Sequence, residues 1–217
     1  MRLKNIQAGV DRSMADYWRD RLAQHHLDHY KGRTLAKLPE DLRVYQHVIE
    51  ETQPQVIVEL GTYAGGAALW FEDQLRTLCQ WVDERPSVIT VDTTLRGASV
   101  ASPSIAFVHG DLATDGVAAE VHRLVDGRQA MVVEDAQHTD ACTTAALTLY
   151  ADLVGPGHYF VVEDAIVDTP LALEGWIGGG VADAIDRFVS EHGEFTQEHL
   201  SPYGLTMHFG GWLKRNG

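Results

Sequence analysis

The stretch VIVELGTYAGG, residues 56–66, decides the fold of this chain. Its apolar, β-branched beginning predicts a strand that is buried on both faces of a parallel sheet. Glu59 lies near the carboxyl end of that strand, where an acid can accept hydrogen bonds from a ligand. Gly61, Gly65 and Gly66 let the backbone turn sharply and approach a ligand closely, because glycine has no Cβ atom. The stretch therefore predicts a strand, a ligand-binding turn and the start of a helix.

The glycine spacing in this turn is E-x-G-x-x-x-G-G, which differs from the G-x-G-x-x-G of dinucleotide-binding folds. An acid at a strand end followed by a wider glycine loop resembles the first motif of class I S-adenosylmethionine-dependent methyltransferases. An ordinary turn whose glycines serve only packing is the alternative. The loop by itself leaves both interpretations open.

The composition is that of an ordinary soluble globular protein, with 45% hydrophobic and 22% charged residues in 217. The formal net charge of −14 argues against binding to a nucleic-acid backbone or an anionic membrane. We find no apolar stretch of transmembrane length and no signal-peptide pattern, so we expect a cytoplasmic protein. Cys79 and Cys142 form no CxxC motif and are expected to be core thiols.

Strands and helices alternate along the chain, which predicts an α/β sheet with its site at the carboxyl ends of the strands. We expect residues 1–34 to form an N-terminal helical lid segment, helical to about Gly32, and residues 35–217 to form one domain. The expected strands are 56–60, 87–92, 104–108, 129–134, 158–162, 195–200 and 205–213. Helices are expected from Pro39 to about 53, from Gly66 to about 79, from after Thr139 to about 153, and over 178–189.

Acids end the second and third expected strands as well. Asp92 closes the second strand, where a carboxylate commonly binds the ribose hydroxyls of a nucleotide. Asp111 follows the third strand in a Gly-Asp pair, which resembles the adenine-edge position of methyltransferases. A surface acid and a helix cap are the respective alternatives.

Three further acids follow the fourth and fifth strands: Asp135, Glu163 and Asp164. Carboxylates at one rim repel each other, and a hard divalent cation such as Mg²⁺ relieves that repulsion. Two separate, exposed strand-end acids are the alternative. His138 lies at the same rim, and an imidazole is the natural base for removing a hydroxyl proton. A capping or hydrogen-bonded structural histidine is the alternative for His138.

Several motifs together resemble the cephalosporin hydroxylase family. They are Leu38-Pro39-Glu40-Asp41, Tyr45-Gln46, residues 59–69, residues 135–138 and residues 162–164. The resemblance implies a Rossmann-like class I methyltransferase fold, with a mostly parallel seven-stranded sheet flanked by helices and an N-terminal helical lid. Some members of the family are metal-dependent O-methyltransferases that act on sugars and natural products.

The resemblance also implies roles for single residues. Asp135, Glu163 and Asp164 match the family's Mg²⁺ ligands, with Mn²⁺ as the other option, and His138 matches the base of catechol O-methyltransferase. The residues expected at S-adenosylmethionine are Glu59, Gly61, Thr62, Tyr63, Gly65, Gly66, Asp92, Thr93, Asp111, Leu112 and Asp135. The chain departs from the pattern at Glu134, which leaves open whether Glu134 or Asp135 faces the site, and at Ala67, where serine is common.

We therefore expect a Mg²⁺-dependent O-methyltransferase that acts on a hydroxyl of a small molecule in natural product biosynthesis. An oxygenase is one alternative, since His138-Thr139-Asp140 spells H-x-D, but its usual β-helix does not suit an alternating chain. A nicotinamide dehydrogenase is disfavoured by the glycine spacing, and a non-catalytic cofactor-binding module remains a further alternative. Partners other than small molecules are not expected, apart from a homo-oligomer, which the family leaves open.

Overall fold

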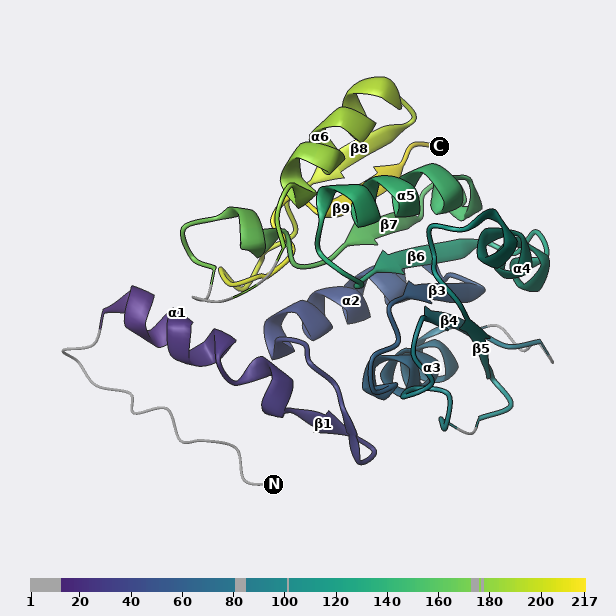
Figure 1. Ribbon diagram of the computed structural model, residues 1–217, viewed down its shortest axis with the longest axis horizontal. Coiled ribbons are helices and arrows are strands. Elements are labelled where there is room, and N and C mark those ends of the chain that lie inside the picture. The colour runs from purple at the N-terminus through teal and green to yellow at the C-terminus, as the bar shows by residue number, and fades with distance from the viewer. Residues whose placement is uncertain (1–12, 81–84, 101, 173–175, 177) are drawn as a thin grey trace.

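The computed structural model describes residues 13–80, 85–100, 102–172, 176 and 178–217. Its centre is a seven-stranded sheet in the order β5-β4-β3-β6-β7-β9-β8 (Figure 1). The strands are β3 (Val56–Leu60), β4 (Val88–Asp92), β5 (Ile105–His109), β6 (Ala130–Glu134), β7 (Tyr159–Val162), β8 (Phe195–Glu198) and β9 (Trp212–Arg215). The strands from β5 to β7 are parallel, and β9 runs antiparallel to both of its neighbours. This is the expected mostly parallel sheet of a class I methyltransferase.

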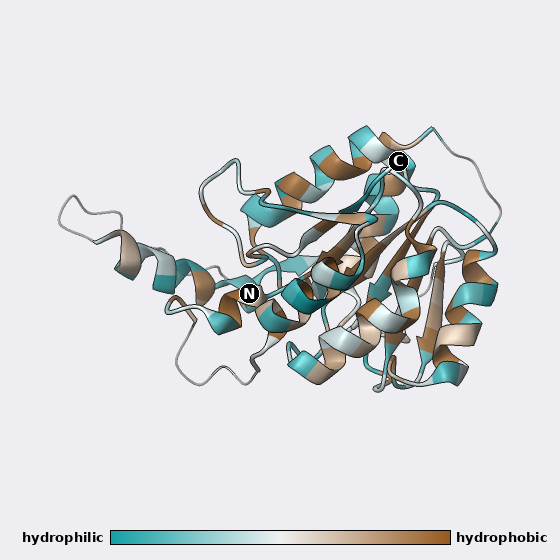
Figure 2. Ribbon diagram, turned by 90° about the horizontal axis from the view of Figure 1, so that it is seen from above, coloured by the Kyte–Doolittle hydropathy of each residue, from teal (hydrophilic) through white to brown (hydrophobic). Residues whose placement is uncertain are grey.

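Helices cover both faces of the sheet. They are α1 (Met14–Leu22), α2 (Pro39–Thr52), α3 (Gly66–Leu78), α4 (Asp115–Val125), α5 (Asp140–Tyr150) and α6 (Val181–Glu191), with short 3₁₀ turns at His25–Leu27, Ala151–Leu153 and Ala165–Asp168. One apolar core joins the sheet to α4, α5 and α6, and a second joins it to α2 and α3. The hydropathy colouring shows the strands as the apolar layer between them (Figure 2). Among the described helices, none is long and apolar enough to cross a membrane.

The strand β3 sits in the middle of the sheet, and all five of its residues are buried. It pairs with β4 on one side and with β6 on the other. The chain therefore runs outward from β3 to β5 and then returns to start β6 on the opposite side of β3. In open α/β sheets such a reversal of strand order opens a crevice at the carboxyl ends of the strands, where ligands bind.

The N-terminal segment is helical only in part. After α1 and one 3₁₀ turn the chain forms a small hairpin of β1 (His29–Tyr30) and β2 (Arg33–Thr34). The expectation of helix up to Gly32 is therefore wrong for the hairpin, where Lys31 and Gly32 have positive φ angles of 47° and 78°. These angles suit the two-residue turn of a hairpin. Residues 1–12 of the expected lid lie outside the described residues, and the division at residue 34 stays a prediction.

The last strand also differs from the expectation. Residues 205–211 form an irregular loop with a turn at 209–210, and the strand begins only at Trp212. Gly210 has a positive φ of 67°, and a Cβ on Gly211 would lie 1.9 Å from the carbonyl oxygen of Val162. The chain passes too close to the end of β7 here for a regular strand with side chains. This loop carries His208 toward the carboxyl ends of the strands.

The hairpin is packed on the start of α3. Tyr30 donates its hydroxyl proton to Asp73 at 2.7 Å, and the Lys31 ammonium pairs with the same carboxylate at 2.6 Å. A Cβ on Gly66 would lie 2.2 Å from the carbonyl oxygen of Thr34, so the two backbones touch. Gly66 is therefore a packing glycine between the hairpin and the helix that follows the ligand-binding turn.

This contact predicts that Gly66→Ala destabilises the protein by about 1–3 kcal/mol, because the added methyl group overpacks a rigid backbone contact. The measurement is the free energy of unfolding in urea. Gly116→Ala is the matched control, since a Cβ there meets nothing within 4 Å and Gly116 lies in α4. That control should be neutral or stabilising by up to about 1 kcal/mol. Equal stabilities for the two variants would contradict the close contact.

Candidate functional site

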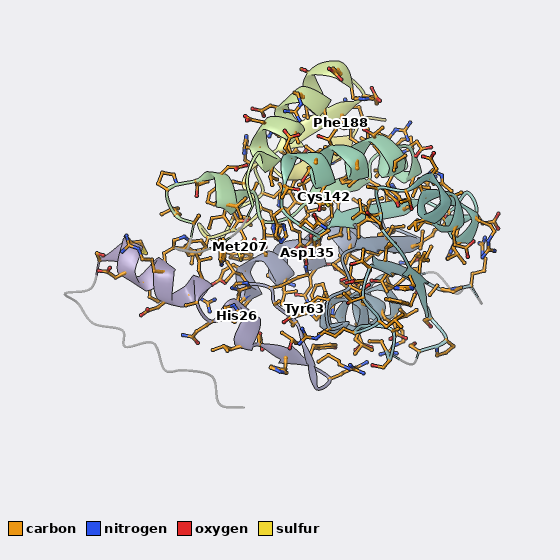
Figure 3. All side chains as sticks on the ribbon, in the orientation of Figure 1. His26, Tyr63, Asp135, Cys142, Phe188 and Met207 are labelled. Atoms are coloured by element: carbon orange, nitrogen blue, oxygen red, sulfur yellow. The ribbon has the colours of Figure 1, made fainter. Side chains whose placement is uncertain are left out.

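A cavity of about 500 Å³ lies at the carboxyl ends of the parallel strands. Tyr63, Asp135 and Cys142 are among its walls and are labelled in Figure 3. The residues expected at the cofactor that line this cavity are Gly61, Tyr63, Asp92, Thr93, Asp111, Leu112 and Asp135. The expected residues outside the lining are Glu59, Thr62, Gly65 and Gly66. The first set is brought together around one space, as the strand ends predict.

The expected residues outside the lining make contacts within the fold that support the turn. Thr90 donates its hydroxyl proton to Glu59 at 2.5 Å, and the hydroxyls of Thr62 and Thr90 lie 2.6 Å apart. A Cβ on Gly65 would lie 2.2 Å from the side chain of Val100. These contacts are internal to the fold, so direct contact of these residues with a cofactor stays a prediction.

The turn itself is held at two points. Gly61 has a φ of +114°, and a Cβ there would lie 2.0 Å from the carbonyl oxygen of Asp135. The carboxylate of Asp92 accepts the backbone N–H groups of Tyr63 at 2.8 Å and Thr94 at 2.7 Å. Asp92 is therefore fixed on the cavity wall by two donors and keeps lone pairs for a ligand.

Asp111 and Leu112 form another wall. Asp111 accepts the backbone N–H of Ala113 at 2.9 Å, while the N-cap of α4 is Thr114. The alternative of Asp111 as a helix cap is therefore not what the structure shows. The carbonyl oxygen of Leu112 accepts the hydroxyl of Tyr150 at 2.8 Å, which anchors this wall to α5.

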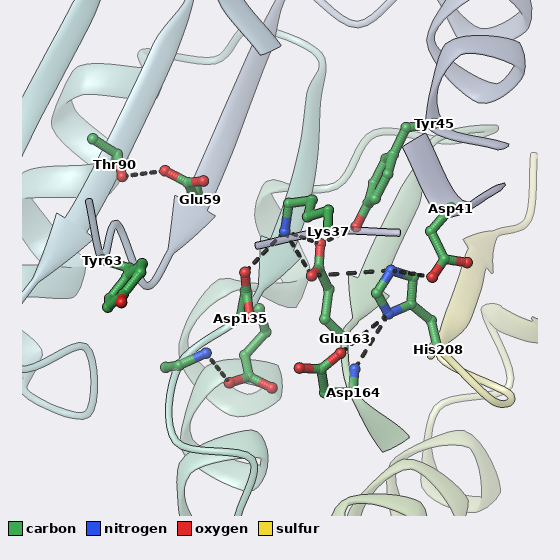
Figure 4. A network of polar contacts seen from close by, with 12 residues as sticks. Lys37, Asp41, Tyr45, Glu59, Tyr63, Thr90, Asp135, Glu163, Asp164 and His208 are labelled. Atoms are coloured by element: carbon green, nitrogen blue, oxygen red, sulfur yellow. Dashed lines mark hydrogen bonds and ion pairs between the residues drawn. The ribbon is translucent and has the colours of Figure 1, made fainter. Parts of the chain in front are cut away.

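An acidic cluster adjoins the cavity. Because β6 and β7 are parallel neighbours, Asp135 after β6 lies close to Glu163 and Asp164 after β7. One group of possible metal-ligand atoms, all within 4.8 Å of one another, comes from Asp135, His138 and Asp164. A second group comes from Glu163, Asp164 and His208. The structure thus brings the three expected acids to one rim, with Asp164 common to both groups (Figure 4).

A buried lysine, which the sequence analysis missed, sits between two of these acids (Figure 4). The ammonium of Lys37 donates to Asp135 Oδ2 at 2.8 Å and to both oxygens of Glu163 at 2.7 and 2.6 Å. The Tyr45 hydroxyl donates a further hydrogen bond to Glu163 Oε1 at 2.6 Å. Lys37 is the one charged residue in the segment Leu35-Ala36-Lys37-Leu38-Pro39. A lysine within such an apolar segment was the sequence signal that could have indicated a buried, paired charge.

Burial and charge set the protonation of this cluster. Burial lowers the pKa of Lys37, but attraction to Asp135 and Glu163 outweighs burial and leaves that pKa raised. Burial and the neighbouring carboxylates raise the pKa of Asp135 and of Asp164. The pKa of Glu163 is lowered, because Lys37 and its hydrogen bonds outweigh the effect of burial. Asp135 and Asp164 are therefore the acids of this cluster whose ionised forms are disfavoured.

His138 faces the side of the cluster away from Lys37. Its Nε2 lies 3.5 Å from Asp164 Oδ2 and 3.8 Å from Asp135 Oδ1. The residue has a left-handed backbone with φ of 51°, and its carbonyl accepts the N–H of Gly179 at 2.8 Å. A Cβ on Gly178 would lie 2.5 Å from that carbonyl, so the glycine loop packs directly on His138. These backbone contacts fix the main chain of His138, and its imidazole lies beside the two acids.

A second histidine, also missed from the sequence, lies behind the acids. The Nδ1 of His208 accepts the backbone N–H of Asp164 at 3.2 Å, and its Nε2 lies 3.6 Å from Asp41 Oδ2. Asp41 is fully buried and accepts the N–H of Met207 at 3.0 Å. Asp41 and Tyr45 are four residues apart on α2, which places both on the face that meets the cluster.

The question of Glu134 or Asp135 is settled by the contacts. Glu134 accepts the N–H of Ala136 at 3.1 Å and the hydroxyl of Thr143 at 3.2 Å, so its carboxyl group points toward α5. Burial raises the pKa of Glu134 to about 7. Asp135 pairs with Lys37 and lines the cavity, and it is the acid that faces the site.

Comparison with known proteins identifies the family of this chain. The family model described as Rhamnosyl O-methyltransferase/CmcI matches residues 23–216. The chain belongs to this family. A rhamnosyl O-methyltransferase of Mycobacterium bovis is 27% identical over 195 residues, which cover 86% of this chain and 78% of the relative. One from Mycobacterium leprae is 25% identical over 193 residues, covering 86% and 82%. The protein is an S-adenosylmethionine-dependent O-methyltransferase.

Solved structures support the fold. A CmcI structure with magnesium and S-adenosylmethionine superposes with a TM-score of 0.68 at 20% identity, covering all of this chain and 90% of that one. CalS11, a TDP-rhamnose 3'-O-methyltransferase of calicheamicin biosynthesis, gives a TM-score of 0.58 at 16% identity over 82% and 79% of the two chains. The class I methyltransferase fold is confirmed.

The buried Glu59 predicts a pH dependence of stability. Burial raises its pKa to about 8, although Lys37 and the Thr90 hydroxyl act in the opposite direction. An unfolded glutamate has a pKa of about 4.3, so the folded protein binds this proton more tightly. The stability from Glu59 is full below about pH 4 and is lost as the pH rises through 8.

We therefore expect Glu59→Gln to flatten the decline in unfolding free energy between pH 5 and 9, by up to a few kcal/mol at the alkaline end. Urea unfolding in EDTA at several pH values measures this. Glu50→Gln, an exposed glutamate of α2, is the control and should keep the wild-type profile. If Glu59→Gln and wild type show parallel profiles, Glu59 is ionised in the folded protein and the expectation is wrong.

Proposed function

We propose that the protein transfers the methyl group of S-adenosylmethionine to a hydroxyl of a sugar or related natural product, with the help of Mg²⁺. The observation that carries the proposal is the acidic cluster with His138 beside a cavity at the reversal of strand order. The cavity wall with Asp92 and Asp111 would hold the cofactor, as the family resemblance implies. Relatives with magnesium in their descriptions, such as MycE with S-adenosylhomocysteine and mycinamycin VI, support the same chemistry.

The acidic cluster fits a divalent cation. The carboxyl groups of Asp41 and Glu163 are buried, those of Asp135 and Asp164 are partly exposed, and all four gather behind and along the rim (Figure 4). Among lysines and arginines in the described part of the chain, Lys37 alone pairs with them. Burial, together with repulsion from neighbouring carboxylates, raises the pKa of Asp164 and of Asp135, so an added cation would be favoured.

Asp135 and Asp164, together with Glu163, would hold the ion, because oxygen ligands are those that Mg²⁺ prefers. When bound, the ion would lower the pKa of an acceptor hydroxyl beside it. The ligand role of Glu163 requires it to share its oxygens with Lys37, whereas Asp135 Oδ1 and Asp164 Oδ2 have no such competitor.

His138 would take the proton of the acceptor hydroxyl at Nε2. The carboxylates at 3.5 and 3.8 Å would stabilise the imidazolium that forms. S-adenosylmethionine, when bound, would supply the methyl group to the deprotonated acceptor oxygen, with the electron pair of the broken carbon–sulfur bond left on sulfur. The cavity positions the two reactants, and such positioning carries much of the rate.

The oxygenase alternative has little support in the site. Its H-x-D motif needs Asp140 beside His138, but Asp140 begins α5 and pairs with Arg187 at 2.6 Å. Asp140 is also outside both groups of possible metal-ligand atoms among the described residues.

Metal removal tests the proposal directly. Methyl transfer from S-adenosylmethionine to a panel of sugars and glycosylated compounds should stop in excess EDTA and return with Mg²⁺ or Mn²⁺. The measurement is mass spectrometry of the methylated product. Undiminished turnover in EDTA would remove the metal from the mechanism and leave transfer driven by His138 alone.

The base role of His138 gives a separate prediction. His138→Ala should lower the rate of methyl transfer by about a hundredfold or more, the usual contribution of a positioned base. Cofactor affinity, measured by calorimetry, should change little, because His138 is outside the cavity lining. His192→Ala, at a half-buried histidine that follows α6 and contacts Glu194, should keep the wild-type rate. A normal rate for His138→Ala from pH 6 to 9 would contradict the assignment.

A further inference from the structure

Lys37 divides the acidic cluster into two sides. Its ammonium faces Asp135 Oδ2 and both oxygens of Glu163, so three hydrogen bonds go to three carboxylate oxygens. The other oxygen of Asp135, Oδ1, is the one near His138. Asp135 therefore lies between a fixed ammonium and the group of ligand atoms formed with His138 and Asp164.

The Lys37 ammonium neutralises carboxylates that water cannot solvate. Lys37 is 2% exposed and Glu163 is 2% exposed, so neither charge is solvated by bulk water. A buried carboxylate without a partner costs several kcal/mol. Lys37 thus offsets two of the buried acids, and Tyr45 supplies one more donor to Glu163 at 2.6 Å.

The backbone directs this lysine inward. Ala36 has a left-handed conformation with φ of 55°, which is uncommon for a residue other than glycine. Leu35 and Leu38, on either side of the Ala36-Lys37 pair, are buried at 6% and 1% exposure. The segment is thereby anchored, while the four-carbon stem of lysine lets the ammonium move without the backbone.

We propose that Lys37 is the counter-ion of the metal-free site, and that its ammonium competes with a divalent cation for Asp135 and Glu163. This inference rests on the metal-dependent function proposed above. Two cations that share the carboxylate of Asp135 repel each other. Lys37 must therefore weaken the binding of the divalent ion or withdraw when the ion binds. The lysine would stabilise the fold of the site before the ion binds. By competing for the same carboxylates, it would also let the ion dissociate more readily.

Lys37→Met tests the competition, because methionine keeps an apolar stem of similar length and removes the charge. We expect Mn²⁺ to bind this variant at least tenfold more tightly than wild type, as measured by electron paramagnetic resonance in the presence of S-adenosylhomocysteine. In EDTA the variant should melt at a lower temperature than wild type, and Mn²⁺ should raise its Tm more. Lys31→Met, which removes the pair with Asp73 on the hairpin, is the control and should leave Mn²⁺ affinity unchanged.

Equal or weaker Mn²⁺ binding by Lys37→Met would show that the lysine orders the acids for the metal, and it would overturn the proposal. Binding by the variant but not by wild type would uphold Lys37 as counter-ion and remove the metal from the proposed function. Binding by neither protein would overturn both. If Lys37→Met does not fold, Lys37→Gln, which keeps a hydrogen-bond donor and removes the charge, is titrated with Mn²⁺ in its place, and equal or weaker binding than wild type again overturns the proposal.

Discussion

The backbone contact between Gly61 and Asp135 holds the two halves of the site together. The N–H of Asp135 donates to the carbonyl of Leu60 at 2.8 Å, and a Cβ on Gly61 would lie 2.0 Å from the Asp135 carbonyl. The ends of β3 and β6 are thus fixed against each other at the point where strand order reverses. The glycine turn follows β3 and the acidic rim begins directly after β6, so this contact fixes the turn against the rim.

The acidic rim lowers the stability of the fold, because it gathers carboxyl groups away from bulk water. The rim and the residues behind it bury more carboxylates than the described lysines and arginines balance, and burial raises the pKa of Glu59, Asp135 and Asp164. A protein selected only for stability would replace such groups with apolar ones. Carboxyl groups with such raised pKa values, gathered beside one cavity, are typical of functional sites, and a bound cation would favour their ionised forms.

The sheet and the rim acids were readable from the sequence because they depend on local patterns. Buried β-branched runs predicted the parallel strands, and acids directly after those runs had to meet at one edge. The hairpin at 29–34 was missed because its turn uses Lys31 in place of the usual asparagine or glycine. Lys37 and His208 were missed because only the tertiary fold brings them to Glu163, across long separations in the chain.

The segment that precedes the sheet is thus part of the site. Residues 35–45 supply Lys37, Asp41 and Tyr45, and all three contact the acids or the histidine behind them. Leu38 from the same segment packs with Trp18 and Leu22 of α1 in a separate small core. The helix α1 is therefore packed against the segment that carries the lysine paired with Asp135 and Glu163.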